Sequence, residues 1–184
     1  LAAPREPIFA FNLGLTLSRL GRAEEAENAL RAALKHKPDF VAAAFELGAL
    51  LHRTGKLDEA EKCFRQVLRL APVHPHADLA LAAILVDAGR PTEAETASRR
   101  GLSAAAEPRL KAQLYLQLAQ ALRRQRKDSE ALAVLDMAEK LDPALPNLGR
   151  HRAETLQNLN RFDEAVAAFE KEIARAPADP ALHH

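Results

Sequence analysis

Residues Val41–His74 read VAAAFELGALLHRTGKLDEAEKCFRQVLRLAPVH, and this segment repeats the pattern of residues 7–40 just before it. Each segment has two runs with apolar residues at helical spacing, joined by a turn that contains glycine and closed by a proline. The segments superpose after a shift of 34 residues, which aligns Leu13 with Leu47, Gly14 with Gly48, Gly21 with Gly55, Ala26 with Ala60 and Pro38 with Pro72. A fixed period in which apolar, glycine and proline positions stay in step indicates an array of structural repeats.

The same pattern continues along the whole chain. It divides the 184 residues into repeats at about 7–40, 41–74, 75–111, 112–145 and 146–179, and we expect a single domain over residues 1–184. The third repeat departs most, because Ala82 replaces the glycine, Gly101 falls inside the second helix, and residues 103–111 include about three extra residues. Residues 1–6 and 180–184 look like parts of flanking repeats, so we expect a piece of a longer array or of a multidomain protein.

Short signals predict how the turns and helix starts are made. Gly21 and Asn160 suit a left-handed turn position, because glycine and asparagine adopt positive φ at the lowest cost. Asp58 is placed to cap the second helix of its repeat. Thr92, with Glu95 three residues later, fits a capping box at the start of the next second helix.

Leucine followed by a small residue recurs in the first helices, alanine recurs early in the second helices, and proline ends the repeats. These positions are Leu13-Gly14, Leu47-Gly48, Leu81-Ala82 and Leu118-Ala119, then Ala26, Ala60, Ala94, Ala131 and Ala165, then Pro38, Pro72, Pro143 and Pro177. The pattern resembles the tetratricopeptide repeat and is typical of bacterial arrays of that family. The resemblance implies an all-α fold, a right-handed α-solenoid of about five antiparallel helix pairs. Arg152, at a position that is leucine elsewhere, is a departure in the fifth repeat.

The composition excludes several classes of protein. The formal charge is +1 and aromatic residues make up 4%, so the basic surface with stacked aromatics typical of nucleic-acid binding is not indicated. Cys63 is the single cysteine, which excludes an internal disulfide and zinc sites built from several thiolates. No apolar run approaches the ~18 residues of a membrane-spanning helix, and no signal-like segment is present. We therefore expect no membrane insertion and a cytoplasmic location.

No motif indicates catalysis, since a Gly-rich phosphate loop, an HExxH pair and a nucleophile elbow are all lacking. His74 and His76 would offer two imidazoles to a metal, but no third ligand is evident nearby, and a surface turn is the better interpretation. We predict that the protein is not an enzyme and has no metal site and no cofactor. His183 and His184 are either native or the start of a purification tag. The basic run 123–127 leaves RNA binding as an alternative to a solvated surface.

The resemblance implies that the first helix of each pair lines an inner groove where a partner binds. The residues expected there are Phe11, Leu15, Phe45, Ala49, His52, Leu79, Ala83, Gln113, Gln117, Gln120, Arg124, Arg150 and His151, with Val86 and Leu116 on the same face. Exposed apolar surface marks interaction sites. We therefore predict a scaffold that binds a peptide or helix of a protein partner, with the partner's apolar side in the groove and its acidic end against Arg124 and Arg150.

Three alternatives stay open at this point. A flanking part of the chain, rather than a partner, would cover Phe11 and Phe45. The repeats would recruit substrate to, or regulate, a larger enzyme such as a transferase whose catalytic part lies outside this chain. The exposed ends of the array would mediate self-association.

Overall fold

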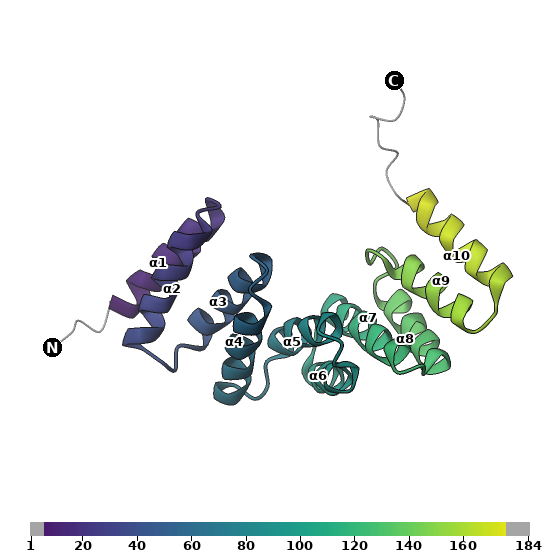
Figure 1. The fold of residues 1–184 in the computed structure, drawn as a ribbon, viewed down its shortest axis with the longest axis horizontal. Coiled ribbons are helices and arrows are strands. Elements are labelled where there is room, and N and C mark those ends of the chain that lie inside the picture. Colours follow the sequence, from purple (N-terminus) through teal and green to yellow (C-terminus); the bar gives the residue numbers. More distant parts are fainter. Residues whose placement is uncertain (1–5, 176–184) are drawn as a thin grey trace, which may run out of the picture.

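The fold is a curved stack of helix pairs, seen in a computed structural model that describes residues 6–175. Within that range the chain forms ten α-helices and no strand. They are α1 (Glu6–Arg19), α2 (Ala23–His36), α3 (Val41–Arg53), α4 (Leu57–Leu70), α5 (Pro75–Asp87), α6 (Pro91–Ala104), α7 (Pro108–Arg124), α8 (Asp128–Leu141), α9 (Leu148–Asn158) and α10 (Phe162–Arg175). Consecutive helices pair, and the pairs stack in chain order into an arc whose two ends rise on the same side (Figure 1). The expected all-α repeat fold is confirmed.

Aliphatic packing between the helices holds each pair together. In the second pair Leu51, Phe64 and Val67 are fully buried. Gly48 lets α3 and α4 approach closely, because a Cβ added there would lie 3.1 Å from the Cβ of Cys63 and from the Phe64 ring. Isolated helices of about 12–15 residues are marginal in water, whereas burial of one Leu or Phe side chain contributes roughly 1.5–3 kcal/mol. The array is therefore stabilised by packing between helices more than by helix propensity.

The turn inside each pair uses one residue with positive φ. Gly21, Gly55 and Gly89 have φ values of 75°, 79° and 69° at this position, and Arg126 and Asn160 have 65° and 59°. The predictions for Gly21 and Asn160 are confirmed. Left-handed backbone costs a residue with a Cβ roughly 1–2 kcal/mol, so the packing of α7 on α8, and not local preference, imposes the fourth turn on Arg126.

The predicted capping residues are wrong. α4 begins one residue before Asp58, and α6 begins one residue before Thr92. The N-cap positions are instead Lys56 and Arg90, and neither side chain makes a capping hydrogen bond. Both cations pair with a carboxylate of the preceding repeat. At these two positions the side chain therefore forms an ion pair with the preceding repeat instead of capping its own helix.

The extra residues in the third repeat lengthen α7. This helix has 17 residues, compared with 14 in α1 and 13 in α3. Its first turns pack against both helices of the preceding pair, where Leu110 and Leu114 join Leu79 and Leu102 in one apolar cluster. The joint between the third and fourth pairs is therefore the most extensive in the array.

A column of glutamates at the repeat period links each second helix to the next pair. Each glutamate of this column accepts hydrogen bonds from an arginine one helical turn later and from a residue of the following repeat. The three are Glu27, Glu61 and Glu95. The bonds to the following repeat join Lys56 Nζ to Glu27 (2.8 Å), Arg90 Nη1 to Glu61 (2.8 Å) and Gln125 Nε2 to Glu95 (2.9 Å). Burial raises the pKa of Glu61, but the hydrogen bonds from Arg65 and Arg90 outweigh burial and leave that pKa lowered.

Glu61→Ala should lower the free energy of unfolding by about 1 kcal/mol at neutral pH, since the two arginines it bonds stay solvated. Because the pKa of Glu61 is lowered on folding, its contribution is present above the ordinary value of 4.5 and is lost as the pH falls below it. Urea unfolding at neutral and at acid pH measures the difference in the free energy of unfolding between Glu61→Ala and the wild type. Glu24→Ala, at an exposed site on α2, is the control, and a gap of equal size at both pH values would contradict the assignment.

Candidate functional site

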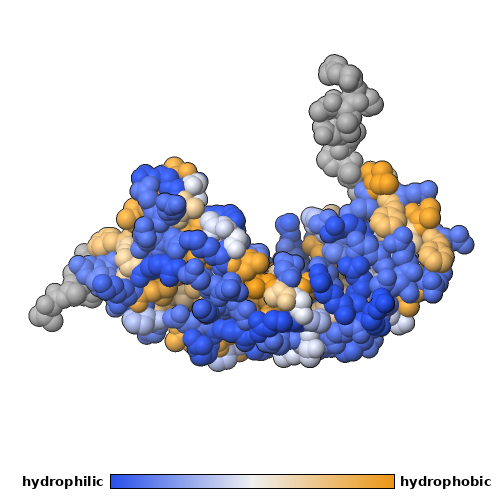
Figure 2. Space-filling model, in the orientation of Figure 1, coloured by the Kyte–Doolittle hydropathy of each residue, from blue (hydrophilic) through white to orange (hydrophobic). Residues whose placement is uncertain are grey.

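The inner face of the arc carries a broad apolar pocket of about 470 Å³. It is lined by Phe45 and His52 from α3, by His76, Leu79, Ala80 and Ala83 from α5, by Gln113, Leu116 and Gln117 from α7, and by Leu145 and Pro146 from the connection between α8 and α9. Figure 2 shows hydrophobic surface at the bottom of the arc, between two more hydrophilic limbs. The pocket therefore lies where three consecutive first helices meet.

Phe45 forms one wall of the pocket and is held from two sides. Its ring centre lies 5.7 Å from that of Phe64 on α4 and 5.1 Å from that of His74. His74 is itself fixed as the N-cap of α5, where its Nδ1 accepts a hydrogen bond of 3.1 Å from the Ala77 backbone N–H. Such packing presents the Phe45 ring to the groove in one orientation.

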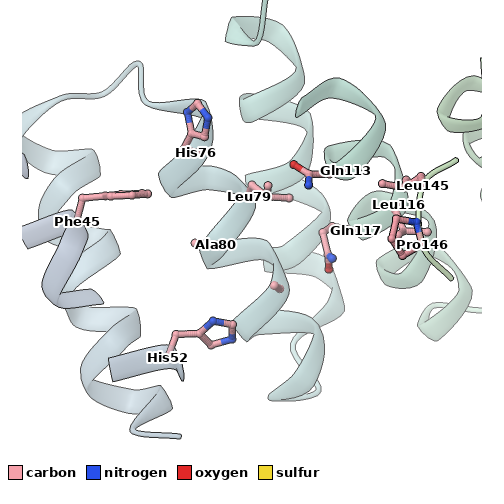
Figure 3. Close-up of a pocket in the computed structure, with 11 residues that line it drawn as sticks. Phe45, His52, His76, Leu79, Ala80, Gln113, Leu116, Gln117, Leu145 and Pro146 are labelled. Carbon is pink, nitrogen blue, oxygen red and sulfur yellow. The ribbon is translucent and has the colours of Figure 1, made fainter. Parts of the chain in front are cut away.

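Four polar side chains border the apolar surface, namely His52, His76, Gln113 and Gln117. Gln113 and Gln117 lie one helical turn apart on α7 and face the pocket from the side opposite Phe45 (Figure 3). A glutamine side chain both donates and accepts hydrogen bonds, as a peptide group does. No Asp, Glu, Lys or Arg is among the described residues that line the pocket. The site thus suits an apolar side chain flanked by neutral polar groups.

Six of the residues expected on the concave face line this pocket, and they are Phe45, His52, Leu79, Ala83, Gln113 and Gln117. Leu116 lines it as well. Sequence reasoning missed His76, Ala80, Leu145 and Pro146. The last two close the fourth repeat, and a Leu-Pro pair there indicates only a helix end. Nothing in that pair predicts that the connection folds against the groove.

The other expected residues lie outside the pocket lining. Phe11 packs its ring 4.9 Å from that of Phe40. Arg124 and Arg150 are exposed, and neither forms an ion pair with another residue in the range 6–175. The remaining expected positions, which are partly buried, are Leu15, Ala49 and Gln120.

Apart from Leu116, which is 8% exposed but lines the pocket, two residues expected on the groove surface are buried. Val86 is 1% exposed and belongs to the hydrophobic core, because α7 as well as α6 packs against its helix. His151 is 7% exposed, with its Nδ1 3.5 Å from Glu154. Burial lowers the pKa of His151, Glu154 opposes that shift, and the positive charges of Arg150 and Arg123 add to it. These two side chains pack the array rather than line its groove.

Other potential chemistry in the described part of the chain is sparse. Between residues 6 and 175, no three His, Cys, Asp or Glu side chains come together in the way a metal site needs. Cys63 is partly buried, and burial raises the pKa of its thiol, so it packs as a small apolar residue. None of the helices in this range combines the length and the apolar character that crossing a membrane requires.

Known repeat profiles match most of the sequence. A tetratricopeptide repeat profile matches residues 11–75, 53–107 and 79–146, and a second profile of that description matches residues 153–181. No curated protein sequence matches the chain. Among solved structures, MamA from Desulfovibrio magneticus RS-1 has a TM-score of 0.85 and 21% identity, covering 95% of this chain and 97% of its own.

Two further solved structures show the same likeness. YrrB, described as a TPR protein with an unusual peptide-binding site, has a TM-score of 0.79 and 20% identity, covering 98% of this chain and 92% of its own. A thermophilic TPR protein from Thermus thermophilus has a TM-score of 0.71 and 24% identity, covering 96% of this chain and 94% of its own. At these identities the structures share the fold with this chain.

Proposed function

The chain belongs to the tetratricopeptide repeat family, and from that premise we propose that it is a non-catalytic scaffold whose apolar pocket binds a segment of a protein partner. The observation that carries the proposal is the exposed apolar surface that α3, α5 and α7 build together on the concave side. Binding pockets are mostly apolar, with a few polar groups that fix the orientation of the ligand. We expect the partner to be met in the cytoplasm.

The lining of the pocket favours an apolar side chain of the partner. A charged group placed there would lose its water without gaining an ion pair, because the described lining residues include no carboxylate, lysine or arginine. Gln113 and Gln117 would bond the peptide groups next to that side chain. The peptide-binding site described for YrrB, which has the same fold, supports a peptide as the ligand class.

The acidic end of the partner belongs to the finer part of the proposal. Arg124 and Arg150 are exposed and without an ion-pair partner among residues 6–175, so an acidic residue of the partner would pair with them. Exposed ion pairs contribute only ~0–1 kcal/mol. The apolar pocket should therefore set most of the affinity, and the arginines should set the direction in which the segment lies.

Peptides selected from a random display library against the chain test this proposal. Ala83→Arg places a long charged side chain in the pocket, and we expect it to weaken binding of the selected peptides about tenfold or more, a change of ~1.4 kcal/mol or more. Fluorescence anisotropy with labelled peptides gives the dissociation constants. The selected peptides should share a large apolar residue.

Ala133→Arg provides the matched control, because it adds the same side chain at an exposed position of α8 outside the pocket. Its dissociation constants should equal those of the wild type. The proposal fails if no peptide is selected, or if peptides bind Ala83→Arg and wild type equally. Arg150→Glu tests the finer part, since it should weaken only those peptides that carry an acidic residue.

A further inference from the structure

A second pocket lies between α4 and α6, two helices on the outer edge of the arc (Figure 1). It has a volume of about 330 Å³ and is lined by Arg65, Leu68 and Arg69 from α4, Leu81 from α5 and Arg100 from α6. None of these residues lines the apolar pocket of the inner face. Three of the five are arginines, and no carboxylate is among the described residues of the lining. The pocket is therefore separate from the proposed peptide site and has a different chemical character.

Arg100 is held at this pocket by a buried carboxylate. Asp78 is 0% exposed, and its Oδ1 accepts hydrogen bonds from both Nε and Nη2 of Arg100. Its Oδ2 has no hydrogen-bond partner within residues 6–175. A buried ion pair generally stabilises a fold no more than apolar side chains of similar volume do, and Ala44 occupies the position of Asp78 one repeat earlier. Stability therefore does not account for this pair, whereas the orientation of the Arg100 guanidinium does.

Arg65 and Arg69 reach the pocket from one face of α4, where they lie one helical turn apart. Arg65 is oriented by hydrogen bonds from Nε to Glu61 at 2.8 Å and from Nη2 to Glu93 at 2.9 Å. The Nη1 groups of Arg65 and Arg100 have no hydrogen-bond partner within residues 6–175. Two guanidinium groups are thus fixed and still have N–H groups to donate.

The charge of Arg69 has no counter-charge in the described part of the chain. Glu61 and Glu93 are shared between Arg65 and Arg90. Arg69 is exposed, and it forms neither a hydrogen bond nor an ion pair with another residue in the range 6–175. The pocket therefore keeps a positive charge that an anion would neutralise.

This set of arginines does not follow from the repeat pattern. At the position of Arg100, the preceding repeat has Gln66 and the following repeat has Met137. At the position of Arg69, the following repeat has Ser103. The pocket is a local feature of the joint between the second and third pairs, as the Asp78 pair is.

We propose that this pocket binds the dianionic phosphoryl group of a phosphate monoester. Guanidinium groups pair with phosphate through two parallel hydrogen bonds. A phosphate monoester carries close to two negative charges at neutral pH and three strong acceptor oxygens, which matches one unpaired arginine and the free N–H groups of two fixed ones. A carboxylate offers one charge and two oxygens. A phosphorylated side chain of a protein partner and a small phosphorylated molecule present the same group to these arginines.

A labelled phosphoserine peptide whose other residues are glycine is the probe, and fluorescence anisotropy gives its dissociation constant. The wild type should bind it at least about tenfold more tightly than the same peptide with glutamate in place of phosphoserine. Arg69→Ala should weaken binding about tenfold, because it removes the unpaired charge. Asp78→Ala combined with Arg100→Ala should weaken binding to a similar degree, although this double variant leaves the net charge unchanged.

Arg99→Ala is the matched control, since it removes an exposed arginine of α6 that is not part of the pocket lining, and it should bind as the wild type does. Circular dichroism should show that Arg69→Ala keeps its helicity, because that side chain is exposed. The proposal is overturned if the wild type does not bind the phosphoserine peptide or binds the glutamate peptide equally well. Equal binding by Arg69→Ala and the wild type, or an equal loss in Arg99→Ala, overturns it as well.

Competition distinguishes the two sources of the phosphoryl group. Inorganic phosphate is added to the complex of wild type and labelled peptide, with sodium chloride at the same ionic strength as the reference. Displacement by phosphate beyond that caused by chloride shows that the phosphoryl group alone is recognised, as a small ligand requires. Binding without such displacement assigns the site to a phosphorylated segment of a partner.

Discussion

Arg100→Ala should lower the free energy of unfolding by about 3 kcal/mol at neutral pH, as measured by urea unfolding. Asp78 is 0% exposed, and its Oδ1 accepts hydrogen bonds from Arg100 Nε at 2.8 Å and Nη2 at 2.5 Å. Its Oδ2 has no hydrogen-bond partner within residues 6–175. Removing the arginine leaves a buried carboxylate without its counter-charge, at a cost of roughly 3–5 kcal/mol. The lower end applies because water reaches the half-exposed Arg100 side chain.

A second substitution separates the charge effect from lost packing. Asp78→Ala in the Arg100→Ala background should recover most of the loss, because Ala44 occupies the same position one repeat earlier and is also 0% exposed. Arg99→Ala is the control. Arg99 is exposed and pairs with Glu95, so this substitution should lower the free energy of unfolding by less than ~1 kcal/mol. A double variant no more stable than Arg100→Ala alone would contradict the assignment.

The pH dependence gives an independent check on Asp78. Burial raises its pKa above the ordinary 3.8, although the hydrogen bonds from Arg100 oppose the shift. Without Arg100 that pKa should rise further. Since a raised pKa in the folded state favours the protonated form, the variant gains stability as the pH falls through the folded pKa. Its deficit should therefore begin to shrink above pH 3.8, whereas the deficit of Glu61→Ala shrinks only below pH 4.5.

The fold could be predicted because local pattern and tertiary packing agree in each repeat. The alanine that recurs early in the second helices is an example, because Ala26 and Ala60 are both 0% exposed in the structure. The start of α4 and of α6 could not be predicted in the same way. Each helix begins one residue before the predicted cap, Asp58 or Thr92, and the N-cap residues Lys56 and Arg90 form ion pairs with the preceding repeat. The one sequence sign of that link is the glutamate column, which recurs at the repeat period and is visible only once the period is known.

The groove could be predicted where a regular first helix fixes the direction of a side chain. Phe45, Leu79 and Gln117 follow that rule and line the pocket. His151 does not, because α9 has only 11 residues and begins after Asn147, whose φ is 63°. The helix start and its facing direction therefore change relative to the other repeats. Helical periodicity does not predict which residues of the connections between helices line the groove.

Gly101→Leu should lower the free energy of unfolding by about 3 kcal/mol, the upper end of the usual cost of overpacking. A Cβ added at Gly101 would lie 2.8 Å from Leu114 Cδ2 and 2.9 Å from Asp78 Cβ. Both residues are 0% exposed, so neither moves aside without disturbing α5 or α7. Replacing a helical glycine improves helix propensity by only ~1 kcal/mol, which does not offset overpacking by a whole leucine side chain.

Thermal unfolding followed by circular dichroism measures this loss, and Ser103→Leu is the matched control. Ser103 is exposed on the same helix and hydrogen-bonds to the Arg100 carbonyl, so leucine there should leave the melting temperature nearly unchanged. Gly101→Ala, which adds only the Cβ, should fall between the two. Equal melting temperatures for Gly101→Leu and Ser103→Leu would show that α6 is not in close contact with α5 and α7. The glycine that makes the third repeat look irregular in sequence is, on this argument, what allows α7 to pack against both helices before it.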